Sequence, residues 1–279
     1  MCKFYLTILI SVGFFFTGCA AKSGNSRFKL DKDSLVQIEL AKKLHEISGI
    51  AFDAKGRLFA HDDERAVIYQ LDPQNGEIIK SFYLGLLVIE ADFEDIAIVG
   101  NTFYLIASNG DLYTFKEGKN EERVEFTTIE TGLHHRNNVE GLCYDPETDA
   151  LLFALKGDPG NDLNEKKFRA VYSFSLKTGK LSPEPRFILD ISEIEKHSKE
   201  KDFAPSGIVR DPVTGHFLVL ASVGNVLVEL DRKGNILSVE KLSKKHHYQP
   251  EGIDFQNAKN LYISDEGKKH GVLSRYKIR

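Results

Sequence analysis

Three glutamates, Glu94, Glu140 and Glu251, occupy the same place in related stretches of this chain. The stretch "NVEGLCYDPETDALLFALKG" (138–157) is echoed by "QPEGIDFQNAKNLYISDEG" (249–267), and each carries a Glu-Gly pair before a short apolar run. Converging carboxylates repel one another unless they take up protons or surround a hard cation. Oxygen ligands without cysteine favour Ca²⁺ or Mg²⁺, and we predict a divalent cation, Ca²⁺, at these glutamates. The alternative is that each glutamate caps backbone amides of its own repeat.

Further polar residues cluster where the second apolar run of a repeat ends. The motifs "HDDE" (61–64) and "SDEG" (264–267) supply His61, Asp62 and Asp265, and two His pairs precede the acidic motif and supply His135 and His247. We predict that these five residues bind a ligand beside the glutamates. The alternative for the histidines is that they are solvated in loops, because nothing marks a triad partner for them.

These residues are carried by an internal repeat. Five segments align on equivalent positions with a period near 45 residues and one longer interval, between Gly141 and Gly207; the equivalent positions are Gly49, Asp95, Gly141, Gly207 and Gly252. Such a period is typical of one four-stranded propeller blade. Within each repeat, short β-rich runs are separated by turns built on Asp72, Asp145, Asp211 and Asp231.

The sequence therefore predicts an all-β fold, a single β-propeller of four-stranded blades. Five blades are favoured, and the alternative is a sixth, degenerate blade within residues 157–203. The last repeat lacks a fourth strand, and the extended run "RFKLDKDSLVQIELA" (27–41) is expected to supply it and so close the ring. First strands line the channel of a propeller, so the glutamates are expected at its mouth. Two insertions, "GDPGNDLNEKKFRA" (157–170) and the helical "DISEIEKHSKEKD" (190–202), are candidate lids over that mouth.

The first residues of the chain are expected to direct its export and not to form part of the folded domain. A short apolar run ends at "FTGC" (16–19), which resembles a bacterial lipobox, so we predict a lipoprotein signal peptide over 1–18, lipidation at Cys19, a tether over 19–30 and the propeller over 31–279. The expected location is the cell envelope, on the outer membrane facing the periplasm. The alternative is an ordinary signal peptide cleaved after Ala20 or Ala21.

The composition limits the kinds of partner that are expected for this chain. The formal net charge is −4, and no Arg-rich stripe is present, so nucleic acid is not expected as a partner. Cys143 lies in an apolar run and is expected to be a buried free thiol. The chain is expected to be a monomer.

The blade motifs "ISGIAFD", "VEGLCYDPETDALLFA", "PSGIVRDPVTGHFLVL" and "PEGIDFQNAKNLYISDEG" resemble the SdiA-regulated (YjiK-like) propeller family. They are similar, more loosely, to NHL-repeat and gluconolactonase/paraoxonase-type propellers. The looser resemblance implies a divalent cation at the channel mouth, held by Glu94, Glu140, Glu251 and Asp265. Two functions stay open: an envelope-anchored module that binds a small molecule or peptide, and a metal-dependent hydrolase of the lactonase or phosphoesterase type. Whether the chain is an enzyme is left open by the sequence.

Overall fold

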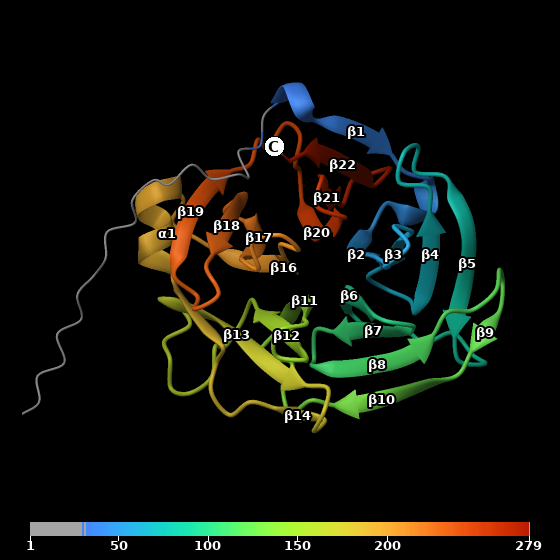
Figure 1. Ribbon diagram of the computed structural model, residues 1–279, viewed down its shortest axis with the longest axis horizontal. Helices are drawn as coiled ribbons and strands as arrows, with labels where there is room; N and C mark the ends of the chain where they lie inside the picture. The colour runs from blue at the N-terminus through green and yellow to red at the C-terminus, as the bar shows by residue number, and fades with distance from the viewer. Residues whose placement is uncertain (1–29, 31, 279) are drawn as a thin grey trace, which may run out of the picture.

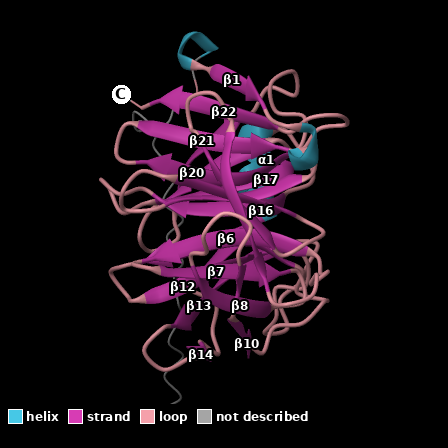
Figure 2. Ribbon diagram, turned by 90° about the vertical axis from the view of Figure 1, so that its right-hand side faces the viewer, coloured by secondary structure: helices cyan, strands magenta, loops and turns pink. Residues whose placement is uncertain are grey.

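The structure of the protein is a computed structural model that describes Leu30 and residues 32–278. Five antiparallel sheets are arranged around a central channel, so the chain is a five-bladed β-propeller (Figure 1). Seen from the side, the strands run along the channel axis and the loops gather on the two faces of the disc (Figure 2). The expected signal peptide, Cys19 and most of the tether lie outside the described residues.

Each blade begins with its channel-lining strand. The first blade contains β2 (Ile47–Phe52), β3 (Leu58–Asp62), β4 (Val67–Leu71) and β5 (Ile78–Leu84), with β9 (Arg123–Val124) parallel to β5. The second contains β6 (Phe93–Val99), β7 (Thr102–Ala107), β8 (Asp111–Lys116) and β10 (Phe126–Glu130). The third contains β11 (Val139–Asp145), β12 (Ala150–Leu155) and β13 (Phe168–Ser175), and both β14 (Lys180–Leu181) and β15 (Phe187–Asp190) pair with β13.

The fourth blade contains β16 (Ala204–Arg210), β17 (Phe217–Val223), β18 (Val226–Leu230) and β19 (Ile236–Lys241). The fifth contains β20 (Pro250–Gln256), β21 (Asn260–Asp265), β22 (Val272–Lys277) and, as its outer strand, β1 (Val36–Glu39). Two 3₁₀ turns, η1 (Lys32–Ser34) and η2 (Lys42–Leu44), flank β1. The predicted closure of the ring by both ends of the propeller is therefore confirmed.

The alternative with a sixth blade is wrong. Residues 157–203 contain the last strands of the third blade and the helix α1 (Ile191–Ser198), which leads into β16. The carboxylate of Asp190 caps α1 by accepting a hydrogen bond from the amide of Ser192 at 2.8 Å. The long interval between repeats is thus a pair of insertions, with no additional sheet.

Turn chemistry separates the strands as predicted. Asp145 accepts hydrogen bonds from the amide of Glu147 (3.1 Å) and the hydroxyl of Thr148 (2.8 Å) between β11 and β12. Asp211 plays the same part between β16 and β17, where it accepts a hydrogen bond from the amide of Val213 at 2.9 Å. These aspartates are committed to Asx turns, which explains why they recur without serving a site.

The apolar core lies between the blades. Five clusters of buried side chains are present, and each joins two neighbouring blades of the ring. Between the first and second blades, Phe59 and Phe103 meet edge to face with centroids 4.9 Å apart. Cys143 is a buried free thiol in the cluster between the third and fourth blades, as predicted. Because every blade buries apolar surface against two neighbours, we expect the propeller to unfold as one unit.

Candidate functional site at the channel mouth

A β-bulge positions the predicted ring of polar residues. In all five inner strands the pairing with the second strand shifts register at the start of the strand, for example between Phe93 and Asp95 and between Val139 and Gly141. The ring residues lie in these bulges: Ser48, Glu94, Glu140, Ser206 and Glu251. A bulge leaves a residue out of the ladder and redirects its side chain, so the fold presents five such positions at one rim.

The residue after each bulge allows neighbouring inner strands to approach closely. A Cβ atom on Gly207 would lie 2.7 Å from the carbonyl oxygen of Glu251, and one on Gly252 would lie 2.6 Å from that of Ser48. Only glycine fits such backbone contacts. Asp95 replaces glycine once, and its buried carboxylate accepts a hydrogen bond from the amide of Leu142 in the next blade at 2.7 Å. The narrow channel therefore explains the recurring glycine.

The serines and the glutamates of the ring have different roles. The hydroxyl of Ser48 donates to the carbonyl oxygen of Glu94 (2.6 Å), and that of Ser206 donates to the carbonyl oxygen of Pro250 (2.7 Å), so both serines tie adjacent blades together. Within the described residues, no backbone amide donates to the carboxylates of Glu94, Glu140 or Glu251. The alternative in which these glutamates cap amides of their own blades is thus not what the structure shows.

The three glutamates line one cavity at the mouth, which we call the acidic mouth. Its volume is about 230 Å³. Seven carboxylates and one lysine line it, together with Ile47, Ser48, Asn138 and Gln249; the charged residues are Glu46, Asp63, Asp92, Glu94, Glu140, Glu251, Glu266 and Lys156. The prediction that the three glutamates converge is confirmed, and the concentration of negative charge is greater than three residues would give.

Lys156 partly neutralises this cavity. Its ammonium group lies 2.8 Å from Oε1 of Glu140, a carboxylate that is only 3% exposed and that also accepts a hydrogen bond from the side-chain amide of Asn138. Burial alone would lower the pKa of Lys156, but the attraction of Glu140 outweighs it and raises the pKa. Burial raises the pKa of Glu140 and, together with the charge of Glu140, that of Glu94. One ammonium group therefore does not balance the carboxylates around it.

Two further carboxyl groups of the cavity, those of Glu251 and Asp63, also have raised pKa values. Burial, and then the charge of Glu140, raises the pKa of Glu251 to about 8. Burial and the neighbouring Glu46 and Glu266 raise the pKa of Asp63 to about 6. These shifts mean that ionised carboxylates here lack enough water or positive charge, so the cavity is suited to hold a cation or protons.

His61 and Asp62 lie beside the mouth but outside its lining. The Nε2 atom of His61 accepts a hydrogen bond from the amide of Gly49 (3.1 Å), while Nδ1 lies 2.9 Å from the carbonyl oxygen of Asp62. Burial lowers the pKa of His61 to about 4, so the ring is neutral. Asp62 is buried and accepts hydrogen bonds from the amides of Glu64 and Arg65. Both residues support the rim of the first blade.

His247 and Asp265 form a buried polar group between the fourth and fifth blades. Nδ1 of His247 lies 2.9 Å from Oδ2 of Asp265, and its Nε2 lies 2.5 Å from the hydroxyl of Tyr276. His247 is only 1% exposed on its side chain, and it does not reach the acidic mouth. His135 is exposed in the loop before β11, next to His134. The structure therefore does not bring the five predicted ligand-binding residues together with the three glutamates.

The same side chains do not surround a metal ion. In the part of the chain that the structure describes, no three His, Cys, Asp or Glu side chains converge closely enough to hold a metal ion. A divalent cation at the glutamates would compete with Lys156 for Glu140 and would need the carboxylates to draw closer. The residues as placed do not fit Ca²⁺, so we derive no step through a metal.

Several residues of the acidic mouth were not singled out from the sequence. Asp63 and Glu266 line the acidic mouth, and each directly follows a residue that was predicted to bind ligand, Asp62 or Asp265. The sequence thus indicated the motifs "HDDE" and "SDEG" but not the residue in each that lines the cavity. Lys156 directly follows β12 in "KGD" (156–158), where the second strands of other repeats are followed by small or acidic residues such as Ser108 and Asp63. A lysine replacing the small or acidic residues of other repeats was the signal that could have identified it.

Comparison with known proteins agrees with this architecture. The SdiA-regulated family model matches residues 25–269. A luciferin-regenerating enzyme has a TM-score of 0.55 at 13% identity, covering 86% of this chain and 94% of its own. The PQQ-bound aldose sugar dehydrogenase of Streptomyces coelicolor has a TM-score of 0.56 at 11% identity, with 87% and 98% covered. The glutaminyl cyclase of Myxococcus xanthus has a TM-score of 0.56 at 12% identity, with 88% and 94% covered. At these identities the likeness shows the propeller fold alone.

Proposed function

The chain belongs to the SdiA-regulated family, and we propose that it is an envelope-anchored binding module whose acidic mouth holds the cationic part of a small molecule or peptide. The observation that carries this proposal is the imbalance of charge in one small cavity. Seven carboxylates line it against a single lysine, and that lysine is already paired with Glu140. A positively charged group that enters would offset the burial and the repulsion by Glu140 that raise the pKa values of Glu94 and Glu251.

An organic cation fits the arrangement better than a bare metal ion. An ammonium or guanidinium group makes hydrogen bonds to separate carboxylates, whereas Ca²⁺ requires six to eight oxygens at about 2.3–2.6 Å. Ca²⁺ is the occupant that the sequence predicts, and it is kept as the comparison probe although the carboxylates as placed do not surround it. For the hydrolase alternative, no histidine lines the acidic mouth among the described residues, so we favour binding.

Binding at the acidic mouth is tested with two probes, CaCl₂ and arginine amide, which carries two positive charges and no carboxylate. We expect arginine amide to raise the melting temperature and to give a saturable heat of binding, because a ligand of the folded state stabilises it. Glu251→Gln and Glu94→Gln each replace a carboxyl group, which can ionise beside a bound cation, with a neutral amide of similar shape. Each is expected to weaken binding about tenfold, the effect of losing one charge-assisted hydrogen bond.

The matched control is Glu77→Gln, which removes an exposed carboxylate outside the acidic mouth and should bind like the unmodified protein. A response to Ca²⁺ alone that is lost in Glu251→Gln would establish the divalent cation as the occupant. No response to either probe, or equal responses in all variants, would exclude the acidic mouth as a cation site.

Anchoring in the envelope is the second part of the proposal. It rests on the lipobox-like "FTGC" ending at Cys19. Among the described residues, no helix has the length and apolar character needed to cross a membrane. We expect the unmodified protein in the membrane fraction of the cell and Cys19→Ala in the soluble fraction, as measured by fractionation and immunoblotting. Retention of Cys19→Ala in the membrane fraction would contradict lipidation at this residue.

A further inference from the structure

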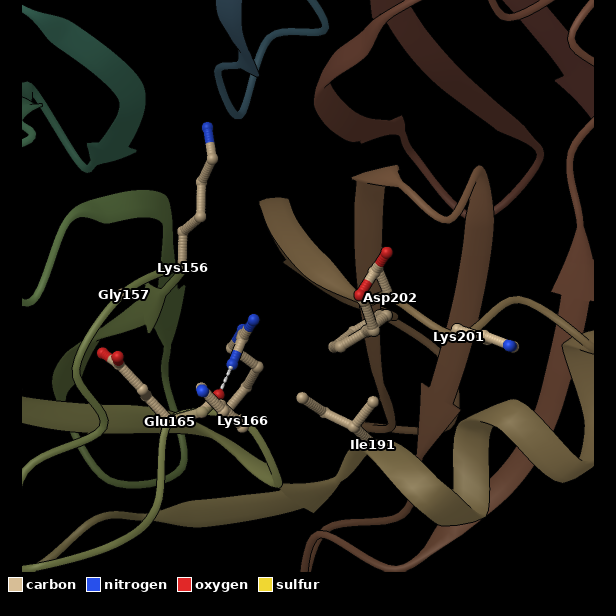
Figure 3. A pocket seen from close by; sticks show the side chains of 9 residues that line it. Lys156, Gly157, Glu165, Lys166, Ile191, Lys201 and Asp202 are labelled. Carbon is tan, nitrogen blue, oxygen red and sulfur yellow. Dashed lines mark hydrogen bonds between the residues drawn. The ribbon is translucent and has the colours of Figure 1, made fainter.

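The two insertions of the repeat build a second cavity, between the third and fourth blades. One wall comes from the segment between β12 and β13, and the other comes from the start of α1 and the segment that leads into β16 (Figure 3). The cavity has a volume of about 450 Å³ and is lined by Lys156, Gly157, Glu165, Lys166, Arg169, Ile191, Lys201, Asp202 and Phe203. We call it the insertion pocket. No other pair of blades in the described structure carries insertions of this length.

Arg169 is the distinctive residue of the insertion pocket. Its Nη1 group donates to the carbonyl oxygens of Glu165 and Phe168, the latter at 3.0 Å. Its Nε atom is buried and has no hydrogen-bond partner, and no carboxylate among the described residues lies within ion-pair distance of it. Burial lowers the pKa of Arg169 despite the charges of Glu165 and Asp202. The guanidinium is thus partly desolvated without a paired anion, an arrangement that costs free energy.

The free donors of Arg169 point to the chemistry of the missing partner. A guanidinium presents five N–H donors in a rigid plane, and two carbonyl oxygens occupy only Nη1. The edge made by Nε and Nη2 matches the spacing of two oxygens in a carboxylate or phosphate. Lys166 and Lys201 also line the cavity and add positive charge to it. Glu165 and Asp202 are exposed to solvent, so water weakens their attraction for the guanidinium.

Apolar side chains complete the pocket. Figure 3 shows Ile191 on the wall opposite Glu165 and Lys166. Ile191 and Phe203 both belong to the buried cluster between the third and fourth blades, and each presents an apolar face to the cavity. A site that combines a cation with apolar contacts suits an organic anion better than a free inorganic ion.

We propose that the insertion pocket binds a small organic anion through a carboxylate or phosphate group held by Arg169. This site is distinct in charge from the acidic mouth and does not depend on the function proposed for it. Lys156 lines both cavities, and its ammonium is paired with Glu140, so its charge serves the acidic mouth. The two sites are therefore neighbours on one rim with opposite preferences.

The test uses inorganic phosphate and acetate as probes, added at millimolar concentration to the intact domain and followed by amide chemical shifts. We expect saturable shifts at residues of the insertion pocket. Arg169→Gln keeps donors for the carbonyl oxygens but loses the positive charge and the pair of parallel N–H donors on the Nε and Nη2 edge. It should weaken binding at least about tenfold. Arg169→Lys keeps the charge alone and should bind with intermediate affinity.

Controls separate this site from its surroundings. Lys177→Gln removes an exposed charge outside the pocket and should bind like the unmodified protein. If Arg169→Gln does not fold, the double variant Lys166→Gln/Lys201→Gln provides the measurement and should weaken binding. A stronger response to phosphate would assign a phosphoryl group to the ligand, and a stronger response to acetate a carboxylate. Absence of saturation with both probes, or equal binding by all variants, would overturn the proposal.

Discussion

A chain that begins at Leu40 is expected to unfold at least about 10 °C below a chain that begins at Leu30, or to aggregate before it unfolds. The shorter chain lacks β1, whose residues pair with β22 from Val36↔Arg275 to Glu39↔Val272. It also loses Ile38, which packs against the cluster between the first and fifth blades. The lost ladder and packing are worth about 5 kcal/mol, and the exposed edge of β22 is free to pair with another chain.

The chain that begins at Leu30 is the control, because it retains every described strand. Calorimetry gives the melting temperature, and size-exclusion chromatography gives the association state. A shortened protein that stays monomeric with an unchanged melting temperature would show that the ring is stable without its outer closing strand. Ile38→Asp provides a second measurement in the full chain, since it keeps the backbone pairing and removes the apolar contact; a smaller loss of stability is expected.

The free energy of unfolding is expected to fall by about 1–2 kcal/mol as the pH rises from about 6.5 to about 8.5. The pKa of Glu251 is raised to about 8 in the folded state by burial and by Glu140, above its ordinary value of 4.5. A group with a raised folded pKa binds more protons when folded, so its stabilisation is complete below the unfolded pKa and is lost as the pH rises through the folded pKa. The raised pKa of Glu94 acts in the same direction.

His61 has a smaller effect of opposite sign in this pH range. Its folded pKa is lowered to about 4 by burial, so it contributes stability above its ordinary value of 6.5 that is lost as the pH falls. Chemical denaturation at several pH values measures the slope. Glu251→Gln should make the slope shallower, because Glu94 still contributes, and Glu77→Gln should leave it unchanged. A profile for Glu251→Gln as steep as that of the unmodified protein would show that the pKa of Glu251 is not raised by folding. That result would weaken the argument for a cation at the acidic mouth.

Much of the fold follows from local rules that the sequence carries directly. The period near 45 residues, the Asx turns at Asp145 and Asp211 and the unpaired strand expected at the N-terminal end together specify five closed blades. The three glutamates could also be placed at the channel mouth, because the start of every inner strand lies on the same rim. These features depend on residue spacing and turn residues, which can be read directly from the sequence.

Side-chain direction and packing were decided only by the tertiary structure. At the ends of β3 and β21, neighbouring residues point to opposite sides, so Asp62 and Asp265 are buried while Asp63 and Glu266 line the acidic mouth. The ion pair of Lys156 with Glu140 joins the residue after β12 to β11 of the same blade, and the spacing of the two residues in the sequence does not predict it. Arg169 acquires its unpaired, half-buried guanidinium because two insertions, far apart in the sequence, meet between blades. Spacing and turn residues predict the ring and its acidic rim. Burial depends on contacts between distant segments, and it sets which charges are paired, which are free and which face a cavity.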